Sequence, residues 1–288
     1  MNPKKISYSQ LAMYQTCPKK YEFCYVLKIP QKISKAASFG SVIHNTLYRF
    51  YQKILEQENT PSLFDEHQPD ISLKALLSLY HKSWFSRGYS SKLEEEKRKK
   101  EGEDVLKRFF KKHGKNFGSP LYLEKSFALH LDAFIISGRI DRIDRMENRN
   151  NIVIPAKAGI YLDSPIQCVE NRCIGESHEV PQFSSQQQET QMDSRLRGND
   201  RKYCRIIDYK TGKLRSQESV DKDLQLSLYA LAAEKCFGLK AESLSLYFLE
   251  HDLEIITSRS EEDLRKTELL IISFAEGIKN GVFEASPS

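Results

Sequence analysis

The sequence lacks several features that mark whole classes of protein. Its 288 residues contain no uninterrupted apolar run of the about 20 residues that a transmembrane helix requires. The opening residues 1–5 (MNPKK) lack the apolar core of a secretory signal peptide. No glycine-rich P-loop motif for a nucleoside triphosphate occurs, so the chain itself is not expected to be an ATP-driven motor. We therefore expect a cytoplasmic globular chain.

Cysteine is scarce, and its spacing carries no motif. The six cysteines include no C-x-x-C pair, which leaves no basis for a zinc site or a disulfide framework. In a cytoplasmic chain, scattered cysteines are expected to be buried and reduced.

Charge is abundant but nearly balanced. The chain carries 44 basic and 39 acidic residues, a formal net charge of +5, and 40% of its residues are hydrophobic. This composition describes a globular chain of one or two domains with ample core, and it does not exclude a single domain. A mildly basic charge suits a polyanionic partner, but it is also common in proteins that never meet nucleic acid.

Two short β-patterned segments carry the residues with the clearest chemistry. They are residues 137–144 (SGRIDRID) and 206–213 (IIDYKTGK). Strand alternation places Asp208 and Lys210 on one face while Tyr209 points away, although its backbone carbonyl remains available to a metal ion. Carboxylates are hard ligands for Mg²⁺ or Mn²⁺, and an ammonium group offsets the charge of a phosphodiester transition state. The combination indicates metal-dependent phosphodiester hydrolysis.

A D-x-K tripeptide alone is a weak signal, and two other interpretations stay open. It can be a surface turn with a solvated charge pair. Asp141, Asp144, Asp208 and Lys210 can also form a structural ion-pair network on a hairpin.

Two flanking segments strengthen the hydrolytic interpretation. In residues 39–47 (FGSVIHNTL), Gly40 and Ser41 are predicted to begin a helix that carries His44, whose neutral imidazole can complete a metal shell. Residues 221–231 read as a helix begun by acidic residues. Gln225 and Tyr229 lie four apart in it and share one face.

In chain order, the motifs G-x-x-x-H, G-R-I-D-R-I-D, D-Y-K-T-G-K and Q-L-x-x-Y resemble the RecB-type nuclease domain of the PD-(D/E)xK superfamily. This group includes recombination helicase-nucleases and CRISPR-associated exonucleases. Residues 6–21 also look like the usual start of that domain, so the resemblance spans nearly the whole chain. It implies an α/β fold with a mixed central sheet flanked by helices and a helical N-terminal part.

The resemblance also implies a function and a set of site residues. The function is a Mg²⁺- or Mn²⁺-dependent DNA nuclease, specifically a RecB-like exonuclease in DNA repair or recombination, acting on single-stranded DNA or duplex ends with a possible helicase partner. Metal ligands are expected at His44, Asp141 and Asp208, and Glu124 matches the acidic position ahead of the first catalytic strand. Lys210 is expected to be the catalytic lysine, supported by Gln225 and Tyr229.

Some relatives bind a [4Fe-4S] cluster through a cysteine that matches Cys17 and three C-terminal cysteines. The chain ends at Ser288 about where that trio would begin, so we expect no cluster. The main alternative to an enzyme is a catalytically inactive, nuclease-like DNA-binding or scaffold subunit, which includes the product of a decayed gene.

The remaining pattern supports an α/β core. Ser7 and Gln10 predict a capping box for an N-terminal helix, and the charged run 92–112 predicts a helix with a solvated face. Its cluster Lys97–Lys100 is an alternative site for phosphate contacts. Dense N-terminal aromatic residues are predicted to form core rather than base-stacking platforms. Strand-like patterns follow Leu121.

Residues 149–201 interrupt this pattern. The segment is rich in Gln, Ser, Asn and Gly, and it separates the two catalytic strands of one domain that otherwise spans residues 1–288. Its ends, 153–160 (VIPAKAGI) and 193–200 (DSRLRGND), can be encoded by reverse-complementary DNA in the same frame. We infer a translated palindromic repeat that entered the gene. The alternative is a specificity loop.

Overall fold

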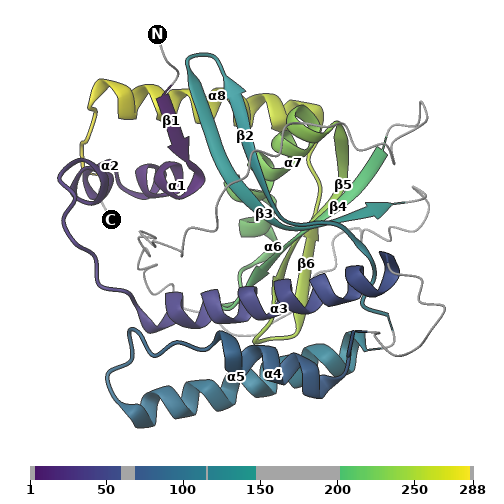
Figure 1. Ribbon diagram of the computed structural model, residues 1–288. Coiled ribbons are helices and arrows are strands. Elements are labelled where there is room, and N and C mark those ends of the chain that lie inside the picture. Colours follow the sequence, from purple (N-terminus) through teal and green to yellow (C-terminus); the bar gives the residue numbers. More distant parts are fainter. Residues whose placement is uncertain (1–3, 60–68, 115, 147–201, 286–288) are drawn as a thin grey trace.

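The computed structural model describes residues 4–59, 69–114, 116–146 and 202–285. These residues form a six-stranded sheet in the order β1-β3-β4-β5-β6, with β2 paired to β3. Helices cover both faces of the sheet (Figure 1). The pairs β1·β3 and β4·β5 are parallel, whereas β2·β3, β3·β4 and β5·β6 are antiparallel. The predicted α/β fold with a mixed sheet is confirmed.

The N-terminal part is helical, as predicted. Helix α1 (Tyr8–Thr16) begins with the predicted capping box, in which Ser7 and Gln10 exchange hydrogen bonds between side chain and backbone. Helix α2 (Pro18–Tyr21) and the π-helical turn η1 (Glu22–Val26) follow. The pattern gave no sign of β1 (Lys4–Ser7), because a strand of four residues is too short to show alternation.

Helices α3 (Lys35–Asn59), α4 (Leu73–Ser83) and α5 (Lys92–His113) pack together below the sheet (Figure 1). The prediction that Gly40 and Ser41 begin a helix is wrong. The helix starts one and a half turns earlier, where the Ser34 hydroxyl accepts a hydrogen bond from the Ala37 amide. A serine at the N-cap satisfies an amide that has no partner within the helix.

Strands β2 (Pro120–Leu131) and β3 (Phe134–Met146) form a long antiparallel hairpin. The strand-like runs expected after Leu121 therefore belong to two continuous strands, and the second of them carries the motif 137–144. Strand β4 (Lys202–Lys210) carries the D-x-K tripeptide and pairs with the end of β3, so Met146 lies opposite Tyr203.

The C-terminal part begins with two helices. Helix α6 (Gln217–Asp221) precedes α7 (Leu224–Phe237), which Asp223 caps at its start and Gly238 ends at φ +65°. A helix that ends in this way needs a residue with a positive φ, and glycine adopts that conformation without steric cost. Strands β5 (Leu239–Phe248) and β6 (Leu253–Thr257) and helix α8 (Glu261–Asn280) complete the fold.

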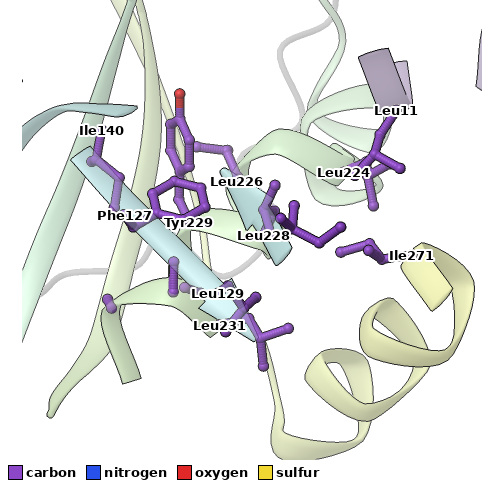
Figure 2. Close-up of a cluster of buried hydrophobic side chains, with 14 of the residues drawn as sticks. Leu11, Phe127, Leu129, Ile140, Leu224, Leu226, Leu228, Tyr229, Leu231 and Ile271 are labelled. Carbon is purple, nitrogen blue, oxygen red and sulfur yellow. The ribbon is translucent and has the colours of Figure 1, made fainter. Parts of the chain in front are cut away.

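Two hydrophobic cores lie on the two faces of the sheet. Helix α7 is buried on nearly all sides between β2, α1 and α8, and Figure 2 shows Leu226, Leu228 and Tyr229 of this helix among Phe127, Leu129, Leu11 and Ile271. The second core joins α3, α4 and α5 to Ile207, Tyr209 and Tyr247 and is rich in aromatic rings. Odd and even residues of β4 thus face different cores.

Residues 149–201, predicted to be an insert, lie outside the described residues. None of the helices in the described ranges combines the length and the apolar character needed to span a membrane.

Candidate functional site

The candidate site lies where strands β3 and β4 separate. Their backbone pairing runs from Met146 opposite Tyr203 to Arg142 opposite Ile207. Beyond that point the Tyr209 amide donates a hydrogen bond of 3.0 Å to the Asp141 carboxylate instead of to a β3 carbonyl. The Asp141 side chain thus takes the place of the next backbone acceptor in the pairing of β3 with β4. The carboxylate is therefore held at the fork between two strands.

Helix α3 brings an imidazole to this fork. His44 Nδ1 lies 3.2 Å from Asp141 Oδ2, and the ring of His44 meets the ring of Tyr209 edge to face. Gly40 lies one helical turn earlier on the same face, where a Cβ would come within 3.1 Å of the Thr211 hydroxyl oxygen. The glycine of G-x-x-x-H thus permits close approach of α3 to the end of β4, which sets the distance for His44.

Strand β2 supplies a second carboxylate. Glu124 lies between Leu123 and Lys125, which are opposite Arg142 and Ile140 of β3. Its backbone has φ +47°, a left-handed conformation that is uncommon for residues other than glycine. Potential ligand atoms of His44, Glu124 and Asp141 all lie within 4.8 Å of one another. One imidazole and two carboxylates from three separate elements thus converge.

A chain of polar contacts adjoins this group. Lys210 Nζ lies 2.7 Å from Asp208 Oδ2 and donates to Gln225 Oε1, also at 2.7 Å. Gln225 in turn donates to the Tyr229 hydroxyl at 2.7 Å. As predicted, Asp208 and Lys210 share one face of β4, while Tyr209 packs in the aromatic core on the other. The ammonium group is fixed from two sides.

The charges of the site shift its pKa values in both directions. Burial lowers the pKa of His44, but the Asp141 carboxylate outweighs burial and raises that pKa to about 9. Burial raises the pKa of Asp141, and His44 overcomes this effect, so the net shift is downward. His44 therefore carries a proton at neutral pH when no cation is present. A metal ion that binds to this nitrogen must displace the proton.

The other two carboxylates are shifted upward. Burial, followed by the charge of Asp141, raises the pKa of Glu124 to about 7. Burial also raises the pKa of Asp208 to about 6, although Lys210 opposes the shift. For Lys210, burial lowers the pKa and Asp208 more than compensates, so the ammonium form is favoured. Both carboxylates therefore bind a proton more readily than they would in water, mainly because they are buried.

The donor set fits a divalent cation. Two carboxylates and an imidazole within 4.8 Å of each other match the ligand preference of Mn²⁺ and, through the oxygens, of Mg²⁺. Asp208 is outside this three-residue group and contacts Lys210, but its charge acts on Asp141 and His44.

The structure thus brings together the site residues that the sequence indicated: His44, Glu124, Asp141, Asp208, Lys210, Gln225 and Tyr229. Tyr209 is also at the fork, and a role for its carbonyl stays a prediction. Asp144 is separate, because it pairs with Arg142 at 2.6 Å. The proposed four-residue ion-pair network therefore loses one member.

Sequence reasoning missed Arg139, whose Nε lies 2.7 Å from Glu124 Oε2. Arg139 is part of the R-I-D-R-I-D motif, of which only the carboxylates were interpreted. The phosphate-contact alternative on α5 loses its central member. Arg98 lies 3.7 Å from the centre of the Phe39 ring and pairs with Glu250, so it packs inward.

Comparison with known families decides the relationship. The family model of the PD-(D/E)XK nuclease superfamily matches residues 5–162 and 190–288. The chain belongs to this superfamily. A search of curated proteins found no match. In this PD-(D/E)XK chain the tripeptide Asp208-Tyr209-Lys210 ends strand β4, and Asp141 lies on the neighbouring strand β3.

Proposed function

We propose that the protein is a Mg²⁺- or Mn²⁺-dependent DNA nuclease. The observation that carries this proposal is the convergence of the His44, Glu124 and Asp141 ligand atoms beside the paired Asp208 and Lys210. The superfamily match supports it independently. A divalent ion at these ligands would shield the phosphate charge and lower the pKa of a bound water.

The residues of the chain have separate tasks in this proposal. His44, Glu124 and Asp141 would hold the cation, and Asp208 beside them would be a further ligand. Lys210 orients the attacking water and offsets the charge that develops on the phosphate oxygens. Gln225 and Tyr229 position the ammonium group, because Gln225 contacts both partners at 2.7 Å.

The finer assignment rests on the ordered motifs and the helical N-terminal part. We infer a RecB-like exonuclease that acts in the cytoplasm on single-stranded DNA or duplex ends in repair or recombination, alone or with a helicase. Linear and circular DNA substrates distinguish the modes of cleavage, because an exonuclease requires an end.

A cleavage assay tests the proposal. Labelled single-stranded and duplex DNA are incubated with Mg²⁺ or Mn²⁺, and EDTA serves as the metal-free control. Lys210→Ala should lower the cleavage rate by about 10³-fold or more, because it removes a fixed charge aimed at the transition state. Lys222→Ala is the matched control, since Lys222 pairs with Glu218 on the exposed surface of α6.

The outcomes separate the alternatives. Metal-dependent cleavage that Lys210→Ala abolishes and Lys222→Ala retains supports the nuclease. DNA binding without cleavage in either metal indicates the inactive DNA-binding subunit. Cleavage by Lys210→Ala at the parent rate contradicts the assignment of the site.

A further inference from the structure

Arg139 is an exposed cation at the edge of the proposed metal site. It lies on β3 two residues before Asp141, and its side chain is 61% exposed. Its Nε lies 2.7 Å from Glu124 Oε2, and Glu124 belongs to the three-residue group described above. The same carboxylate therefore faces a guanidinium group and the place where a divalent ion fits.

The backbone fixes the position of that carboxylate. Glu124 holds φ +47° in the middle of a strand, and conformations of this kind persist at ligand sites because the surrounding structure imposes them. The neighbouring pairs Leu123 with Arg142 and Lys125 with Ile140 set Glu124 across the hairpin from Asp141. The backbone thus holds Glu124 at the site, and Arg139, whose side chain is far more exposed, is the partner with more freedom to move.

The environment of Lys210 differs from that of Arg139. The Lys210 ammonium contacts Asp208 and Gln225 inside the site, and its side chain is 29% exposed. The side chain of Arg139 is 61% exposed, and among the described residues its ion pair is with Glu124. Because the guanidinium half of this pair lies in solvent, the pair contributes less than a fully buried one, and exchange of the partner of Arg139 costs little. A guanidinium group also fits two phosphate oxygens at once.

We propose that Arg139 binds a phosphodiester group of the nucleic-acid strand next to the scissile phosphate, and that it pairs with Glu124 only while the cation is absent. When the Glu124 carboxylate binds the cation, the Arg139 guanidinium is free to contact the substrate. Arg139 is thus a substrate-positioning residue, and this inference rests on the proposed function of the same site.

Binding measurements on Arg139→Ala test the inference. All variants carry Lys210→Ala so that bound DNA is not cut. Mn²⁺ affinity is measured by calorimetric titration without DNA, and a fluorescent single-stranded oligonucleotide reports DNA affinity in Mn²⁺. Arg265→Ala is the matched control, because Arg265 is 74% exposed and pairs with Glu262 on α8.

The two affinities should change in opposite directions. Loss of the competing guanidinium should lower the Kd for Mn²⁺ about threefold, as expected for a surface ion pair. Loss of a charge-assisted phosphate contact should raise the Kd for DNA about tenfold and reduce the slope of log Kd against log salt by about 0.7. Arg139→Lys should recover the salt slope and only part of the affinity, and Arg265→Ala should change neither Kd.

A purely structural role predicts that both affinities weaken together, and that result overturns the inference. An unchanged DNA affinity also overturns it. Failure of the nuclease proposal has a different signature: the parent with Lys210 intact cuts no DNA in either metal. If the opposite shifts persist in that case, the phosphate contact stands without the enzyme.

Discussion

The motif R-I-D-R-I-D places two identical tripeptides one after the other on β3, and their side chains have different partners. In the second copy, Arg142 Nε lies 2.6 Å from Asp144 Oδ1, so its arginine and aspartate pair with each other. In the first copy, Arg139 pairs with Glu124 and Asp141 with His44. The Arg142 side chain is 7% exposed, whereas that of Arg139 is 61% exposed. We call the copies closed and open.

The backbone ladder explains the difference. Pairing of β3 with β4 covers Arg142 to Met146, so the closed copy lies inside the ladder and is sealed by the aromatic core. Arg142 also donates to the Phe117 carbonyl at 3.0 Å and stacks 4.3 Å from the Tyr51 ring centre. The open copy lies at the fork, where its charges meet partners from α3 and β2. The position of each copy relative to the β3–β4 pairing, and not its residue types, therefore decides whether it belongs to the packed core or to the candidate site.

The largest expected effect separates the two aspartates. Asp141→Asn should lower cleavage by about 10³-fold or more, because it removes the charge of a proposed metal ligand, whereas Asp144→Asn should keep the rate within about threefold of the parent. The measurement is single-turnover cleavage in saturating Mn²⁺. Equal losses in the two variants would show that the copies share one role.

The two arginines should differ in stability. Arg142→Met leaves the Asp144 carboxylate beside a buried gap and should lower the free energy of unfolding by about 3 to 5 kcal/mol. Arg139→Met removes an exposed side chain and should stay within about 0.5 kcal/mol of the parent. Urea unfolding in EDTA measures both values. Similar losses would contradict the distinction between closed and open.

The sequence was sufficient for what depends on local pattern. Alternation along β4 correctly separated Asp208 and Lys210 from Tyr209, and residues typical of helix starts located α1 and α7. The fold class and the superfamily followed from the order of the motifs.

What the sequence could not give depends on contacts between distant segments. Gly40 and Ser41 predict a helix start because both are common at N-caps, but Gly40 instead allows close packing against Thr211. The left-handed Glu124 and the divergence of β3 from β4 leave no local pattern. The different fates of Arg139 and Arg142 also depend on strand pairing, which identical tripeptides cannot reveal.

The segment 149–201 offers a way to sharpen the comparison. It joins β3 to β4 next to the closed copy, where Met146 already pairs with Tyr203. A short turn that replaces residues 149–200 should preserve Mn²⁺ binding and cleavage, because the closed ladder separates this join from the fork. Shortening the loop should also stabilise the fold by about 2 kcal/mol through loop-closure entropy.

Cleavage assays and urea unfolding of this deletion variant give both quantities. Loss of cleavage in a folded variant would favour the specificity-loop alternative. Noncomplementary codons at 153–160 and 193–200 in the gene would remove the inference of a palindromic repeat, without affecting the prediction for the site.

The smallest expected effect concerns His113, which lies beside the closed copy. Its Nε2 lies 3.1 Å from the Tyr247 hydroxyl, and burial, followed by the charges of Lys112 and Arg142, lowers its pKa. The unfolded chain therefore binds the proton more readily than the folded one near pH 6. The stability that neutral His113 contributes is full above its ordinary pKa and is lost as the pH falls through the lowered value.

The stability difference between the parent and His113→Gln isolates this contribution, because the carboxylates of the open copy titrate in both proteins. That difference should fall by about 1 kcal/mol between pH 7.5 and pH 5.5 in EDTA. In the Arg142→Met background the fall should be smaller, since one of the charges that lowers the pKa has gone. A difference that does not change with pH would mean that the closed copy does not act on His113. The Arg142 charge would then interact only with Asp144 and the Phe117 carbonyl.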